Sequence, residues 1–126
     1  MIQTQTLLKI IDNSGAKNVQ CIKTLGGFKR KYAYIGDPII VTVKKIRSKN
    51  KLKSKVKKGE VFTAVLIRTK FKQLRKDGSF LFFNENTCVL VDKQKKPIAT
   101  RIFGPVPKEL RTNKLMKIAS ISSGFL

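Results

Sequence analysis

Short runs of alternating apolar and polar residues, separated by turn residues, recur along roughly the first three quarters of the chain. In the first run, Val19, Cys21 and Leu25 fall near a period of two, with polar residues between them. The pair Gly26-Gly27 then ends the run. This alternation is typical of a half-buried β-strand.

Three further runs have the length and composition of strands. Pro38 opens the alternating residues 39–46, and a proline suits the first residue of a strand or an edge strand. Residues 61–67 are almost continuously apolar and rich in β-branched side chains, which indicates burial on both faces or nearly so. Residues 87–91 form another β-branched run.

A hairpin is predicted around Asp77-Gly78. A type I′ turn needs positive φ at both central residues, and Asp-Gly tolerates this conformation. We expect this turn to join a strand over about residues 68–74 to one over about 79–83. Five or six short strands at this spacing favour a small barrel, because closure removes the exposed edges of a compact all-β domain.

The pattern changes after Pro97. Pro107 is placed to begin a short helix, and Thr112 or Asn113 is placed to cap a second helical turn that carries residues 115–118. A chain of 126 residues has room for one core. We therefore expect a single domain over residues 1–126, with the barrel at about 1–96 and a C-terminal loop with short helices at about 97–126.

The charge identifies the class of partner. Lys and Arg number 28 against 7 Asp and Glu, a formal net charge of +21, while 41% of the residues are hydrophobic. This composition predicts a folded basic module that binds a polyanion. No apolar run approaches the length of a membrane span, so we expect no membrane partner.

Catalytic and metal chemistry find little support in the composition. Cys21 and Cys88 lack a CxxC partner, and the chain has no histidine to complete a zinc site, so we expect two buried thiols, with a disulfide as the alternative. The seven carboxylates are scattered singly, and no glycine-rich phosphate loop is present. We therefore expect no enzymatic activity, no cofactor, no metal and no small-molecule substrate.

The strongest pattern in the chain is a basic segment in which cations occupy every odd position from Arg47 to Lys57. In an extended backbone these side chains would share one face at about 6.6 Å spacing, close to the distance between neighbouring phosphates of a nucleic-acid strand. The pattern predicts an extended arm laid along RNA phosphates. A solvated loop that keeps an edge soluble is the alternative.

Two further basic clusters follow turn or strand residues. One is Lys29-Arg30-Lys31-Tyr32, and in the other a period of two places Arg68, Lys70 and Lys72 on one face. Nearby aromatic residues (Phe28, Tyr32, Tyr34 and Phe71) are candidates both for stacking on unpaired bases and for packing on the protein. The residues assigned to RNA binding are Lys17, Lys23, Lys29, Arg30, Lys31, Lys44, Lys45, Arg47, Lys49, Lys51, Lys53, Lys55, Lys57, Arg68, Lys70 and Lys72.

Specific motifs connect the chain to a known family. They include Asp12-Asn13-Ser14-Gly15-Ala16, Leu25-Gly26-Gly27, Arg30-Lys31-Tyr32-Ala33, Val56-Lys57-Lys58-Gly59, Asp77-Gly78 and Thr100-Arg101-Ile102-Phe103-Gly104-Pro105-Val106. In these motifs and their order the chain resembles, from end to end, the large-subunit ribosomal protein L-fourteen family of bacterial and organellar type. One departure is the loop over residues 45–55, which is longer and more basic than the usual bacterial version.

The resemblance implies a mainly β fold, namely a small five-stranded β-barrel with a short C-terminal helical region. It implies a structural role in the large ribosomal subunit, bound to large-subunit rRNA beside other large-subunit proteins. It also implies contact with small-subunit rRNA across an intersubunit bridge, and a docking site for a ribosome-silencing factor at Thr100, Arg101, Lys117 and Ser120. A free barrel-type nucleic-acid binder, such as a translation factor that cycles on and off RNA, is the alternative function.

The composition also bears on the compartment. Of the 28 cations 22 are lysine, a bias that AT-rich codons produce. The family's start coincides with Met1, so we expect no targeting extension. A product of a mitochondrial genome is favoured, with a plastid or the bacterial cytoplasm as alternatives.

Overall fold

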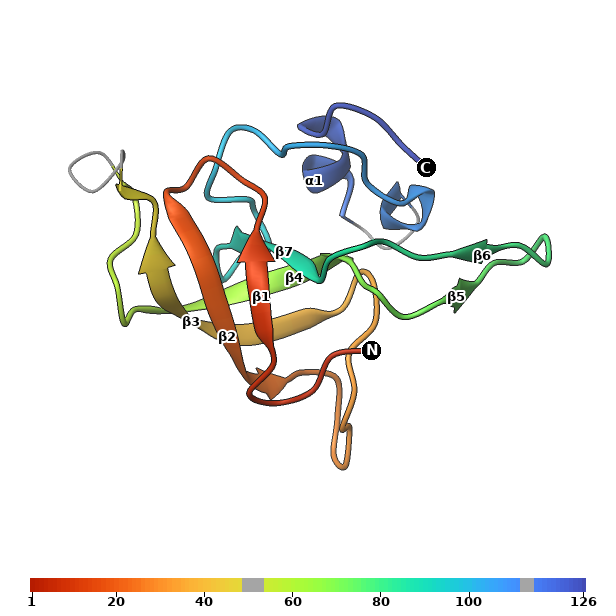
Figure 1. Cartoon of the computed structure of the whole chain (residues 1–126), viewed down its shortest axis with the longest axis horizontal. Helices are drawn as coiled ribbons and strands as arrows, with labels where there is room; N and C mark the ends of the chain where they lie inside the picture. The colour runs from red at the N-terminus through yellow and green to blue at the C-terminus, as the bar shows by residue number, and fades with distance from the viewer. Residues whose placement is uncertain (49–53, 112–114) are drawn as a thin grey trace.

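The computed structural model describes residues 1–48, 54–111 and 115–126 (Figure 1). Five strands close a barrel in the order β1-β2-β3-β4-β7, in which β1 pairs in parallel with β7 and the other pairs are antiparallel. These strands are β1 (Leu7–Ile10), β2 (Ala16–Thr24), β3 (Pro38–Ile46), β4 (Val61–Arg68) and β7 (Thr87–Val91). The expected fold class, a mainly β five-stranded barrel with a short C-terminal helical region, is confirmed.

Smaller elements lie outside the barrel. The strands β5 (Gln73–Leu74) and β6 (Phe80–Leu81) form a separate two-stranded sheet, which projects away from the barrel in Figure 1. The C-terminal region holds the 3₁₀ helix η2 (Lys108–Arg111) and the helix α1 (Met116–Ser120). No helix among residues 1–48, 54–111 and 115–126 has the length and apolar character needed to cross a membrane.

The strand β4 shows why its sequence is almost continuously apolar. Ala64 and Leu66 belong to the hydrophobic core inside the barrel, whereas Val65 and Ile67 belong to a second core on the other face of the strand. In the second core they pack with side chains of the C-terminal region, which lies beside β4 and β7 in Figure 1. The prediction that residues 61–67 are buried on both faces holds for residues 64–67, while Val61 is exposed.

The strand β2 departs from simple alternation near its end. Val19 and Cys21 are buried as predicted, but the register against β3 shifts between Cys21 and Lys23. Such a bulge reverses the faces of the residues that follow. Thr24 is therefore buried, and Leu25, which the period of two placed with the buried residues, follows the strand and is partly exposed.

The hairpin at Asp77-Gly78 forms, but its turn and place differ from the prediction. Of the two central residues, Gly78 has positive φ (87°) and Asp77 does not. The amide of Gly78 donates to the carbonyl of Arg75 at 3.1 Å. Arg75 also pairs with Ser79 at 2.9 Å, the pattern of a type I turn followed by a glycine bulge rather than a type I′ turn. The strands are shorter than predicted, and the barrel is closed instead by β1, which the sequence analysis did not predict.

The C-terminal helices and the cysteines test two further predictions. Leu110 donates its amide to the carbonyl of Pro107, so the predicted helix start at Pro107 is confirmed. The N-cap of α1 is Leu115, without a side-chain hydrogen bond, so the predicted cap at Thr112 or Asn113 is wrong for this helix; both residues lie outside the described ranges. Both cysteines are free and buried, as expected.

Candidate nucleic-acid interface

A hollow of about 1070 Å³ opens on the barrel wall where β1, β2 and β3 lie side by side. Ile10, Ile11 and Ile46 contribute apolar side chains to its lining. Six cations from four segments of the chain also line it: Lys9, Lys17, Lys44, Lys45, Arg47 and Lys58. We refer to this hollow, with these six cations, as the cationic groove.

Local irregularity of the sheet gathers these lysines. The pairing of β2 with β3 shifts register on both sides of Asn18, which lies opposite Lys45. Lys44 and Lys45 are consecutive and both are exposed, which strict alternation along a strand would forbid. The bulges of β2 therefore allow neighbouring lysines of β3 to face solvent together.

The six cations of the groove are not equally available to a ligand. Lys9 forms an ion pair with Glu85, and this hydrogen-bonded lysine lowers the pKa of the Glu85 carboxyl. The guanidinium of Arg47 donates to the carbonyl of Ile10 at 3.3 Å and lies 5.7 Å from the ring centroid of Phe103. The other four cations are exposed and make no ion pair within residues 1–48, 54–111 and 115–126: Lys17, Lys44, Lys45 and Lys58.

The basic segment after β3 is tied to the barrel at its far end. The amide of Lys55 donates to the carbonyl of Ser14 at 3.1 Å, its ammonium donates to the carbonyl of Ile98 at 3.2 Å, and Val56 is completely buried. Ser48 lies in a 3₁₀ turn, residues 55–56 in a bend and residues 58–59 in a turn, so the described ends of the segment do not form a continuous extended strand. Lys57 is exposed. The remaining assigned residues of the segment, Lys49, Lys51 and Lys53, lie outside the described residues.

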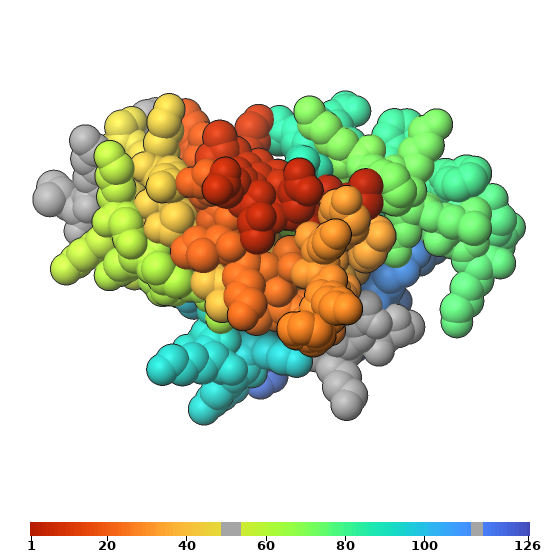
Figure 2. Space-filling model, turned by 90° about the horizontal axis from the view of Figure 1, so that it is seen from below, coloured from red at the N-terminus to blue at the C-terminus, as the bar shows by residue number. Residues whose placement is uncertain are grey.

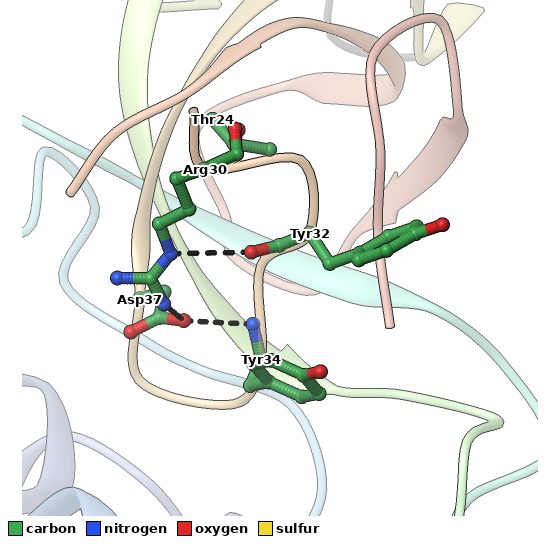
Figure 3. Close-up of polar contacts among 5 residues, drawn as sticks. All are labelled: Thr24, Arg30, Tyr32, Tyr34 and Asp37. Carbon is green, nitrogen blue, oxygen red and sulfur yellow. Dashed lines mark hydrogen bonds and ion pairs between the residues drawn. The ribbon is translucent and has the colours of Figure 1, made fainter. Parts of the chain in front are cut away.

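The loop of residues 26–37 is cross-linked by Arg30 (Figure 3). The guanidinium of Arg30 pairs with the Asp37 carboxylate and donates through Nε to the carbonyl of Tyr32 at 3.2 Å. The same carboxylate accepts the amide of Tyr34 at 2.8 Å, and the hydroxyl of Thr24 donates to the carbonyl of Arg30 at 3.0 Å. Arg30 thus stabilises the loop.

Other cations near this loop remain exposed. Lys29 and Lys31 lie on the loop itself and Lys23 on β2. The amide and carbonyl of Ala33 pair with those of Ile2, and Figure 2 shows the loop (orange) beside the N-terminal residues (red). The loop therefore forms part of one continuous surface with the start of the chain.

The three cations assigned near the hairpin do not share one face. Residues 69–72 lie in no strand, so the predicted alternation ends with β4. The guanidinium of Arg68 donates to the carbonyls of Pro105 at 3.0 Å and Phe103 at 2.6 Å, and burial lowers its pKa. Lys70 and Lys72 are exposed. Arg68 thus joins β4 to the C-terminal region, while the two lysines face solvent.

The segment of Thr100 and Arg101 is held by the turn before β2. The side-chain oxygen of Asn13 accepts the amides of Thr100 and Arg101 at 3.0 and 3.2 Å, and its Nδ2 donates to the Thr100 hydroxyl at 2.9 Å. The neighbouring Asp12 is buried, and its carboxylate accepts the amides of Ser14 and Leu90 at 3.0 and 3.2 Å. Burial raises the pKa of the Asp12 carboxyl, and these hydrogen bonds oppose that shift.

The exposed residues assigned to a protein partner lie on two segments that a backbone bridge joins. Ile102, which follows Arg101, forms a parallel bridge with Ser122 just after α1. Lys117 and Ser120 are exposed on α1, as are Thr100 and Arg101 on the neighbouring segment. We refer to these four residues as the C-terminal face.

Sequence reasoning missed some residues of these surfaces. Lys9 went unassigned because β1 was not predicted, and Asn13 gave no signal of its long-range hydrogen bonds. Lys58 was visible as the end of the basic run but was left out of the assignment. Within the part of the chain that the structure describes, no three Cys, Asp or Glu side chains gather as metal ligands do.

A closed barrel with a cationic groove on its wall defines the class of small basic β-barrel proteins. The model of the family described as ribosomal protein L14p/L23e matches residues 1–126, the whole chain. The chain therefore belongs to this family, which confirms the resemblance drawn from its motifs. As a member it is a protein of the large ribosomal subunit and acts in translation.

Proposed function

We propose that this protein is a structural constituent of the large subunit that binds rRNA through the cationic groove. The observation that carries the proposal is the gathering of four exposed lysines on one hollow of a protein with net charge +21. These lysines come from three parts of the chain and form no ion pair with any other described residue. Further exposed lysines on β2, on the loop of residues 26–37 and before the hairpin extend the RNA contact: Lys23, Lys29, Lys31, Lys70 and Lys72.

The chemistry of the groove favours phosphate contacts over base recognition. A lysine ammonium is a point charge on a flexible stem, which neutralises a phosphate without selecting a base. Arginine can form bidentate contacts, but the three arginines assigned to RNA binding, Arg30, Arg47 and Arg68, already donate to carboxylate or carbonyl oxygens. We therefore expect binding with strong salt dependence, and rRNA shape rather than sequence as the basis of recognition.

A salt wash of purified large subunits tests this proposal. An assembled constituent remains on the subunits through a wash that removes a cycling factor, and a variant with the four groove lysines replaced by glutamine incorporates poorly. Complete release of the wild-type protein by a moderate wash would favour the alternative, a factor that binds and leaves. Quantitative immunoblotting of sedimented subunits measures both outcomes.

The C-terminal face supports a second, protein-binding role. Its four side chains are exposed, and Asn13 holds the segment that carries Thr100 and Arg101 in place, which suits a preformed docking surface. We assign it to a ribosome-silencing factor, and we assign contact with small-subunit rRNA and neighbouring large-subunit proteins to other exposed surfaces. Arg101→Ala should weaken the factor while leaving incorporation into large subunits intact; failure to assemble would show that Arg101 is structural.

The compartment rests on composition. The excess of lysine over arginine supports a mitochondrial ribosome and synthesis inside the organelle. Fractionation of cells that carry the protein, with immunoblotting of mitochondrial, plastid and cytoplasmic ribosomes, decides between the three locations.

A further inference from the structure

Phe28 is the most exposed large hydrophobic side chain that the structure describes, with 94% of its surface accessible. The other three aromatic residues suggested for stacking, Tyr32, Tyr34 and Phe71, are only 41–46% exposed. The rings of Tyr34 and Phe71 pack against each other, with their centroids 6.4 Å apart. Those three are partly covered by the protein. The protein covers far less of the Phe28 side chain, so its ring is available to a partner.

The backbone around Phe28 holds the ring away from the barrel. Gly26, Gly27 and Lys29 all have positive φ (125°, 121° and 63°), and this conformation is uncommon for a lysine. A Cβ added at Gly26 would lie 2.3 Å from Nη1 of Arg30, so glycine at this position lets the guanidinium pack against the turn. The arginine that cross-links the loop thus packs directly against this turn.

The base of the loop is fixed by several contacts. The ion pair of Arg30 with Asp37 and the hydrogen bonds drawn in Figure 3 join the two sides of the loop. Pairing of Ala33 with Ile2 attaches its far side to the N-terminus. Because the ordering of the loop occurs on folding, little further entropy is lost when a partner engages the tip.

The charge around the ring indicates the chemistry of that partner. The ammonium of Lys29 lies 5.7 Å from the ring centroid of Phe28, and Lys31 is exposed on the same loop. The single carboxylate of residues 26–37, that of Asp37, is already paired with Arg30. An exposed ring flanked by uncompensated cations matches a nucleotide, which offers a flat base and an anionic phosphate together.

We propose that Phe28 stacks on an unpaired base while Lys29 neutralises an adjacent phosphate. This inference rests on the RNA binding proposed above and adds a base-contacting residue to it. The contact is tolerant of base identity, because every base has a flat π face. It therefore selects unpaired nucleotides over helical ones without reading sequence.

The test uses the full chain and two RNA-like probes of equal length, an oligoadenylate and the same sugar-phosphate backbone without bases. The protein has no tryptophan, so Phe28→Trp introduces a single indole reporter that retains the ability to stack. Phe28→Leu keeps an exposed apolar side chain but removes the ring. Phe82→Leu is the matched control, because Phe82 is also exposed and has the Lys72 ammonium 5.7 Å from its ring centroid.

We expect the wild type, Phe28→Trp and Phe82→Leu to bind the oligoadenylate at least about fivefold more tightly than the abasic probe. The indole fluorescence of Phe28→Trp should be quenched by the oligoadenylate alone, and Phe28→Leu should bind both probes equally. Circular dichroism should show all variants folded, since the replaced rings lie at the surface.

Other outcomes overturn the inference in distinguishable ways. A preference for bases retained by Phe28→Leu would show that the ring does not supply the stacking. A wild type that binds both probes equally would refute stacking while leaving phosphate binding intact. A wild type that binds neither probe at low salt would refute the proposed RNA binding as well.

Discussion

Replacement of the four exposed groove lysines tests whether the cationic groove is the site of RNA contact. The change is to glutamine at Lys17, Lys44, Lys45 and Lys58, which removes four charges and keeps much of each aliphatic stem. All four side chains are exposed, and the hydrophobic core does not include them. We expect the barrel to fold normally, with some gain in stability from weaker mutual repulsion.

The magnitude follows from counterion release. Each neutralised phosphate adds roughly 0.7–0.9 to the magnitude of the slope of log affinity against log salt. If each of the four lysines contacts one phosphate, the variant should have a slope smaller by about 3. As salt rises from 50 to 200 mM, the ratio of the RNA affinity of the wild type to that of the variant should then fall by about sixtyfold.

The assay is a fluorescence-anisotropy titration of a labelled large-subunit rRNA fragment at several salt concentrations. The matched control replaces four exposed lysines outside the groove by glutamine, so that both variants lose the same net charge: Lys93, Lys95, Lys96 and Lys108. We expect the control to keep nearly the wild-type slope. Equal slopes for the two variants would refute the reasoning, because binding would then follow total charge rather than the groove.

Three further predictions concern buried or clamping groups. Because burial raises the folded-state pKa of Asp12, the wild type loses stability as the pH rises from the usual carboxyl pKa through the folded-state pKa. In urea unfolding, the free energy of unfolding of the wild type minus that of Asp12→Asn should be largest at low pH, and parallel pH profiles of the two proteins would contradict this. Burial raises the pKa values of the Cys21 and Cys88 thiols, so iodoacetamide should label them in urea and leave them unmodified in the native protein. Rapid labelling of the native protein would show that the barrel is open to the reagent. Asn13→Ala removes three hydrogen bonds to residues 100–101 and should lower the free energy of unfolding by about 1–3 kcal/mol, with faster hydrogen exchange at the amides of these two residues. Unchanged exchange at these amides would show that Asn13 does not hold the segment.

Several elements of this fold were predictable because their signal is local. Alternation in residues 39–46 corresponds to burial of Ile39, Val41 and Val43 in β3. The continuous apolar run of β4 anticipated burial on two faces, and Asp77-Gly78 anticipated a hairpin. In each case the residues that carry the signal are the residues that form the element.

Other elements depended on partners distant in the chain. The strand β1 has only four residues, and it forms by pairing with β2 and β7. Its own sequence does not indicate which strands it pairs with. The bulge that buries Thr24 instead of Leu25 arises from the register against β3. A period of two specifies which side chains share a face, but not which strand lies alongside or where the register shifts.

The same distinction separates the charge of the protein from its candidate site. Composition alone predicted a folded polyanion binder, because the excess of cations does not depend on their arrangement. The tertiary structure decided which cations remain available. Arg47 and Arg68 each donate to carbonyls 35–37 positions away in the chain, whereas Lys9, Lys17 and Lys45 meet in one groove because their strands pair. Hydrogen bonds and strand pairing over such separations are made only when the barrel closes, so no local pattern could have revealed them.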